Sequence, residues 1–153
     1  MAYETFITYG YGVIAPRDTK NITVEHLVDF CKQFKCTRDF IEDIGIDDIY
    51  EFSDDSMSLA GEYEGDTCSY AAFASMLRDA IYEKTGVGLE ACSDDNGTDY
   101  LLFVQTYPWR CSEADKQIQT EEDVRNLIQP YLVSLYGEDN APKFGYFECK
   151  NEG

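Results

Sequence analysis

A tight turn between two apolar runs is the feature that most constrains this fold. Asn96-Gly97 lies between residues 88–92 and residues 99–107. Asn-Gly between apolar runs is the strongest short-range signal for a β-hairpin, because both residues adopt the positive φ that the turn needs. Residues 100–104 are apolar on both faces, which predicts a strand in the centre of a sheet. The chain is therefore expected to build an antiparallel sheet.

Three segments carry apolar residues at the spacing of an amphipathic helix. Thr120, with Asp123 three residues further on, is expected to open the last of them. Gly137 is placed to end it, and Pro130 should kink it. The predicted helices cover residues 24–35, 67–84 and 121–136.

Two further segments are expected to be strands. Residues 3–14 are rich in Tyr, Thr, Ile and Val, and Gly10 and Gly12 would permit a bulge or a bend. Residues 144–149 can add a strand near the end of the chain. Both segments would then join the sheet that the hairpin begins.

The segment 39–66 has a weaker pattern, for which we expect a short helix over about 38–44 and a strand over about 56–63. The order of elements predicts an α+β fold in a single acidic domain covering residues 1–153. This fold would have a mostly antiparallel sheet of about 4–5 strands, with about 3–4 helices packed on one face.

The charge of the chain is strongly negative and unevenly distributed. The formal net charge is −18, and residues 39–77 contain eleven acidic residues and no Lys or Arg. Apolar residues are threaded through this acidic segment, which indicates that it folds onto a core and presents a fixed acidic face. The acidity argues against direct binding of nucleic acid or of an anionic membrane, because both require a basic surface.

A fixed array of carboxylates would complement a basic surface, and the most basic surfaces in a cell are nucleic-acid channels. The sequence therefore predicts a small protein-binding inhibitor or regulator of a nucleic-acid-handling protein, such as a nuclease. It would act as a nucleic-acid mimic that occludes a basic groove. In character, though not in any motif, it resembles small acidic phage anti-defence products, including anti-CRISPR proteins. Alternatively, the acidic residues serve only to keep the protein soluble. The candidate contacts are Asp47, Asp48, Glu51, Asp54, Asp55, Glu62, Glu64 and Trp109.

Trp109 is included because aromatic residues and arginine are the usual anchors of protein interfaces, and Arg110 follows it. A tryptophan in this position could equally cover the core. Several tyrosines are also expected to be partly exposed: Tyr107, Tyr131, Tyr136 and Tyr146.

Six cysteines and a single histidine bear on metal binding and catalysis. The chain has no Cys-x2-Cys pair, so the cysteines are expected to be core thiols and no cofactor is predicted. The alternative function is a zinc-stabilised protein-interaction module. Its candidate ligands are Cys36 first, and then Cys31, Cys92, Cys111 and His26.

An enzyme is not expected. A Ser-His or Cys-His mechanism would have to use His26, for which the sequence places no partner, and there is no glycine-rich phosphate loop. A small cytosolic enzyme that uses His26 or a cysteine is therefore the third hypothesis.

The N-terminus lacks a signal-peptide pattern and no apolar run reaches membrane-spanning length, which predicts a cytoplasmic protein, in the host cytosol if it is phage-encoded.

Overall fold

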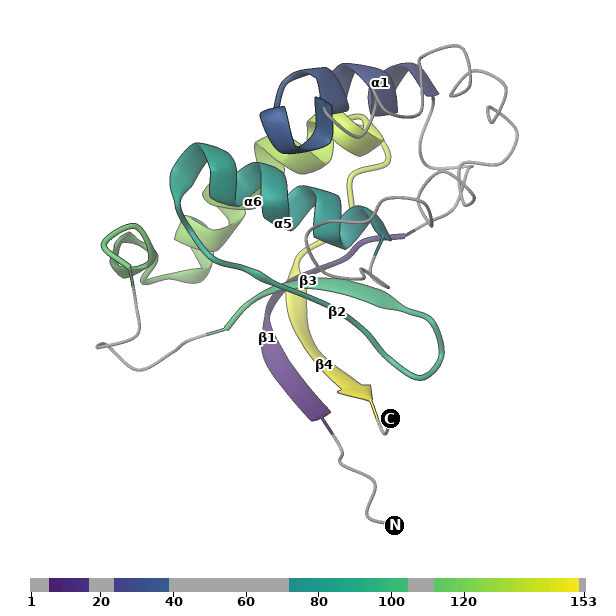
Figure 1. Cartoon of the computed structure of the whole chain (residues 1–153). Coiled ribbons are helices and arrows are strands. Elements are labelled where there is room, and N and C mark those ends of the chain that lie inside the picture. The colour runs from purple at the N-terminus through teal and green to yellow at the C-terminus, as the bar shows by residue number, and fades with distance from the viewer. Residues whose placement is uncertain (1–5, 17–23, 39–71, 105–111, 152–153) are drawn as a thin grey trace.

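The structure, a computed structural model, describes residues 6–16, 24–38, 72–104 and 112–151. In these ranges the fold is α+β, as the sequence predicts, with four antiparallel strands in one open sheet and the helices gathered on one side of it (Figure 1). The elements in chain order are β1 (Phe6–Ile14), α1 (Val24–Lys32), α5 (Ala72–Thr85), β2 (Glu90–Ser93), β3 (Asp99–Phe103), the 3-10 helix η2 (Asp115–Gln117), α6 (Glu121–Tyr136) and β4 (Gly145–Asn151).

The sheet has the strand order β2-β3-β1-β4. β3 therefore lies inside the sheet, which confirms the expectation for residues 100–104. The predicted hairpin joins β2 to β3. In its loop the Asp94 carboxylate accepts hydrogen bonds of 2.9 Å from the backbone N–H groups of Asn96 and Thr98, and Gly97 has a φ of +80°.

The two faces of the sheet carry separate hydrophobic clusters. On the helix side, Val13 and Leu101, which lie opposite each other on β1 and β3, join a core with the inward faces of α1, α5 and α6. The largest fully buried side chains of these helices are Tyr136, Phe30, Phe73, Leu27, Met76, Leu77, Ile81 and Ile128. The opposite face carries a smaller cluster of Tyr100, Leu102 and Cys149, with Cys92, Val104 and Phe147 packed against it.

The sheet is coiled, so that its two edge strands approach each other on the side away from the helices. The Asn151 side-chain amide of β4 donates a hydrogen bond of 3.2 Å to the backbone oxygen of Ser93 in β2. The register of β1 against β4 runs without a bulge from Phe6 to Gly12, and the glycines of β1 instead permit this coil through a close approach to β3. A Cβ at Gly10 would lie 2.5 Å from the Phe103 carbonyl oxygen, and a Cβ at Gly12 would overlap the Leu101 carbonyl oxygen. Only glycine allows the two backbones to come this close.

Helix α6 begins and ends where the sequence predicts. The Thr120 hydroxyl accepts from the Asp123 backbone N–H and the Asp123 carboxylate accepts from the Thr120 N–H, both at 3.1 Å, which is a complete capping box. Gly137 follows the last turn. The expectation of a partly exposed Tyr136 is wrong: its ring is buried in the core, and its hydroxyl donates to the backbone oxygen of Pro16.

The first predicted helix is shorter than expected. α1 ends at Lys32, and residues 35–38 form a new helical turn. Glu83 of α5 caps this new turn, because its carboxylate accepts hydrogen bonds of 2.9 Å from the backbone N–H groups of both Lys35 and Cys36. These N–H groups open the new turn and have no partner within a helix. A contact from another helix thus stabilises the turn that follows α1.

Several predicted elements lie wholly or partly outside the described residues. They are residues 3–5 of the first strand, residues 39–44 of the short helix, the strand over 56–63, the start of the helix over 67–84, and residues 105–107 with Tyr107.

The close approach at Gly12 predicts a large effect of one added methyl group. Gly12→Ala should destabilise the fold by about 1–3 kcal/mol, because the Cβ meets backbone that cannot move aside. The measurement is urea unfolding followed by circular dichroism. Gly88→Ala is the matched control, since nothing lies within 4 Å of a Cβ there. Equal stability of the two variants would contradict the proposed cause of the coil.

The contact of Glu83 predicts a contribution to stability that depends on pH. Burial alone would raise the pKa of Glu83, but the hydrogen bonds from Cys36 and Lys35 outweigh it and hold the pKa below the usual 4.5. The stabilisation is therefore present above pH 4.5 and is lost as the pH falls through the lowered pKa. The gap in unfolding free energy between the native chain and Glu83→Gln should shrink between pH 6 and pH 3. A gap that stays constant with pH would exclude this role.

Candidate functional site

An open pocket lies where the first turn of α6 meets the sheet, with a cavity volume of about 320 Å³. Its distinctive side chains are three tyrosines from the sheet, Tyr9, Tyr11 and Tyr146, together with Glu121 from the helix. The remaining lining residues are Gly10, Phe103, Val104, Gln119, Thr120 and Val124.

Strand periodicity and register bring the three tyrosines together. Tyr9 and Tyr11 are two residues apart on β1, so both point to the helix side, and Tyr146 of β4 lies opposite Tyr11. The rings of Tyr11 and Tyr146 meet edge to face with centroids 5.0 Å apart, and those of Tyr9 and Tyr146 are stacked at 6.0 Å. The result is one continuous aromatic surface on this side of β1 and β4.

Much of this aromatic surface faces solvent, because the helices cover only part of β1 and β4. Both strands extend past the helix layer (Figure 1). Tyr9 and Ile7 are each 58% exposed, and Tyr146 is 55% exposed. Exposed large apolar side chains are unremarkable one at a time, but a contiguous set of them marks an interaction surface.

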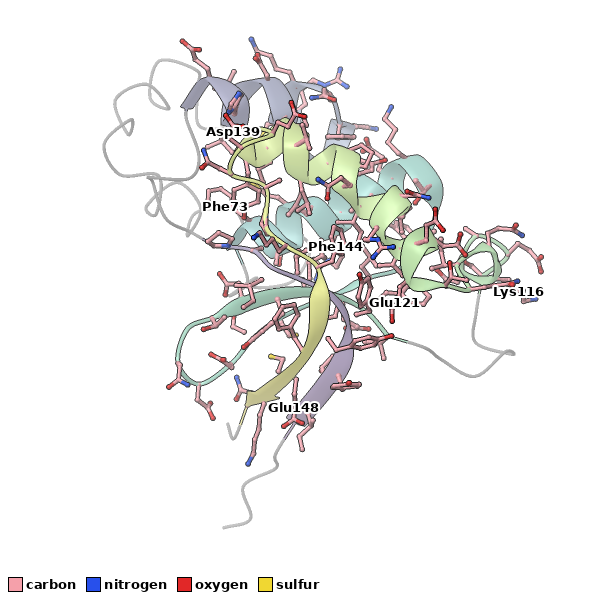
Figure 2. All side chains as sticks on the ribbon, turned by 180° about the vertical axis from the view of Figure 1, so that it is seen from behind. Phe73, Lys116, Glu121, Asp139, Phe144 and Glu148 are labelled. Carbon is pink, nitrogen blue, oxygen red and sulfur yellow. The ribbon has the colours of Figure 1, made fainter. Side chains whose placement is uncertain are left out.

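Glu121 adds a carboxylate to the pocket, and a hydrogen bond from a tyrosine fixes its position. Figure 2 shows Glu121 at the end of α6 that lies against β4. The Tyr146 hydroxyl donates a hydrogen bond of 2.6 Å to Oε1 of Glu121, and this bond is the main cause of the raised pKa of Tyr146. On the inner side, Arg125 donates to the Tyr11 hydroxyl at 3.3 Å. These bonds fix two of the three rings and the carboxylate relative to one another.

The charge around the pocket favours a cation over an anion. The first turn of α6 carries Glu121, Glu122 and Asp123 against the single Arg125 of the next turn. A helix N-terminus can bind anions through its N–H groups, but here the N–H of Asp123 is already bonded to Thr120, and three carboxylates lie in the same turn. Aromatic faces beside a carboxylate are the usual surroundings of a bound cation.

The predicted contact residues lie elsewhere in the chain. All seven acidic candidates, Asp47, Asp48, Glu51, Asp54, Asp55, Glu62 and Glu64, and also Trp109, are outside the described residues. Sequence reasoning named Tyr146 as a partly exposed aromatic but did not connect it with Tyr9, Tyr11 or Glu121. The spacing of Tyr9 and Tyr11 could have indicated a shared aromatic surface, because side chains two residues apart on a strand lie on the same face.

The described candidates for a zinc site are spread over the fold. Cys31 and Cys36 lie near each other on the helix side, whereas Cys92 belongs to the cluster on the opposite face of the sheet. His26 is exposed on α1 beside Gly137. Cys111 is outside the described residues. Among the side chains that the structure describes, no group of three or more His, Cys, Asp or Glu is arranged to hold a metal ion.

The four described cysteines are thiols in surroundings that disfavour the thiolate. Burial raises the pKa of Cys31 to about 12, and burial with the nearby carboxylates of Glu83 and Asp79 raises that of Cys36 to about 12. The pKa of Cys92 and that of Cys149 are also raised, chiefly by burial. A nucleophilic cysteine needs the opposite shift, so these four side chains do not have the character of an activated nucleophile.

Comparison with known proteins gives no relative from which a function could be transferred. No protein-family model matches the chain, and neither the curated proteins nor the solved structures contain a match. Of the helices in the described ranges, none has the length and apolar character needed to cross a membrane.

The raised thiol pKa values predict slow alkylation. With iodoacetamide at pH 7–9, Cys31, Cys36, Cys92 and Cys149 should each react at least tenfold more slowly in the folded chain than in urea, because thiolate is scarce and access is limited. Peptide mapping by mass spectrometry measures each site separately. Faster labelling of any one of them in the folded chain would instead support a catalytic thiol.

Proposed function

We propose that this chain is a small acidic protein that binds a basic surface of a nucleic-acid-handling protein and thereby inhibits or regulates it. The observation that carries the proposal is the charge distribution: a net charge of −18, with eleven acidic residues and no basic residue over 39–77. Carboxylates in place of phosphates would occupy a groove that otherwise binds DNA or RNA. In this proposal the protein acts in the cytoplasm, and in the host cytosol if a phage encodes it.

The described surface supports a role in protein binding. Interfaces that hold partners are rich in aromatic side chains with a polar rim, whereas a coat of charge for solubility needs no aromatic residues. Tyr9 and Tyr146 are more than half exposed beside the acidic first turn of α6. Charge complementarity would speed the encounter, and the aromatic surface would add contact area once the partner is bound.

The test compares two variants of equal charge. One reverses Asp47, Asp48, Glu51 and Asp55 to Lys. The other reverses four acids that the structure shows exposed elsewhere, Asp29, Glu113, Glu138 and Asp139. Each variant has a net charge of −10, since each reversal adds two positive charges. Each is immobilised and challenged with a bacterial lysate at low and then moderate salt, and the bound proteins are identified by mass spectrometry.

The native chain should retain a nucleic-acid-binding protein that leaves as the salt rises, and DNA or RNA should compete with the chain for that protein. Reversal within 39–66 should reduce retention at least tenfold, or about 1.4 kcal/mol, while the matched reversal has a much smaller effect. Equal retention by both variants would show that net charge alone attracts the protein. No competition with nucleic acid would contradict the proposed mode of inhibition.

A further inference from the structure

We infer that the pocket of Tyr9, Tyr11, Tyr146 and Glu121 receives an arginine side chain of the basic partner. This inference rests on the proposed function for the identity of the partner, but the recognition of a guanidinium group by the pocket can be tested by itself. Charge complementarity alone gives little specificity, and an arginine bound in this pocket would add a specific contact to it.

The aromatic rings provide the faces that a guanidinium group stacks on. The Tyr9 and Tyr146 rings are close to parallel, with an angle of 16° between their planes, and both are more than half exposed. A guanidinium is planar and weakly hydrated, so it stacks on aromatic faces more readily than the compact ammonium of lysine does. An arginine side chain would cover ring surface that is otherwise exposed to water.

Glu121 provides the matching charge at the edge of the rings. An ionised carboxylate has about four lone-pair positions. In Glu121 the Tyr146 hydroxyl occupies one position on Oε1, which leaves acceptor positions for guanidinium N–H groups. Because that hydroxyl also holds the carboxylate in place, less conformational freedom is lost when the cation binds.

The pocket has the size and the surroundings for one such side chain. Its volume of about 320 Å³ is at the small end of ligand pockets, which begin near 300 Å³. Two basic groups of the described residues are placed here by contact or register: Arg125 donates to the Tyr11 hydroxyl, and Lys150 lies opposite Ile7. Glu148 lies opposite Tyr9, and Figure 2 shows it on the part of β4 that extends away from the helices. With Glu121, Glu122 and Asp123 of the first turn of α6, four acidic groups face these two basic ones, so the described part of this surface is net negative.

The test uses a defined probe and needs no partner. The chain, with its tyrosines labelled with carbon-13, is titrated with Nα-acetyl-arginine methylamide and followed by NMR of the ring signals. The neutral isostere Nα-acetyl-citrulline methylamide and the lysine analogue are titrated in parallel. The Tyr9 and Tyr146 signals should shift in a saturable manner with the arginine probe, at least fivefold more weakly with the lysine probe, and not with the citrulline probe.

Two pairs of variants separate the pocket from the rest of the surface. Tyr146→Ala and Glu121→Gln should each weaken arginine binding at least fivefold. The matched controls are Tyr82→Ala, which removes a tyrosine that is 62% exposed on α5, and Glu122→Gln, which removes the neighbouring carboxylate that does not line the pocket. Circular dichroism and thermal unfolding verify that all four variants are folded.

The outcomes distinguish this inference from the proposed function. Equal shifts with arginine and citrulline, or no loss of binding in the two pocket variants, would overturn the arginine pocket whatever the lysate experiment shows. If the probe binds as expected but no nucleic-acid-binding protein is retained from the lysate, the pocket stands and the proposed partner class fails. If both succeed, Tyr146→Ala should also reduce retention of the captured protein.

Discussion

The close approach of β1 to β3 at Gly10 and Gly12 is the contact on which the rest of the structure depends. It lets the sheet coil away from the helices, so that β2 and β4 converge and enclose a second small cluster on the far face. The same coil carries the outer parts of β1 and β4 beyond the helix layer (Figure 1). A flatter sheet would leave Tyr9 and Tyr146 in a different relation to α6, and the pocket would not form as it does.

On the helix side, some helix ends are capped by neighbouring residues and others by residues distant in sequence. The ends of α6 follow from neighbouring residues, because Thr120, Asp123 and Gly137 complete the helix without help from elsewhere. The turn after α1 is capped by Glu83, which lies about fifty residues away in sequence and accepts from the N–H groups of Lys35 and Cys36. Local capping can be read from sequence, whereas a cap supplied by another helix can be recognised only once the two helices are seen side by side.

Much of the fold could be predicted for this reason, and the candidate site could not. The hairpin, the central strand and α6 are each specified by a short pattern of residues. The pocket combines Tyr9 and Tyr11 from the first strand, Tyr146 from the last and Glu121 from α6. Their proximity depends on the register of β1 against β4 and on the coil of the sheet, neither of which is encoded by any one segment. Tyr136 was assigned wrongly for the same reason: its burial is decided by the core around it and by its bond to Pro16.

The pairing of the first strand with the last has a consequence for how the chain folds. β1 pairs with β4 along seven positions, from Phe6 opposite Asn151 to Gly12 opposite Gly145. Almost the whole chain must therefore be closed into a loop before this ladder can form, and contacts of such long range slow folding. During synthesis on the ribosome, β1 and β3 are made before β4. Until β4 is added, the edge of β1 that pairs with β4 and much apolar surface would remain uncovered. The tyrosine pocket would be among the last features to appear, since it requires β4 and α6 together.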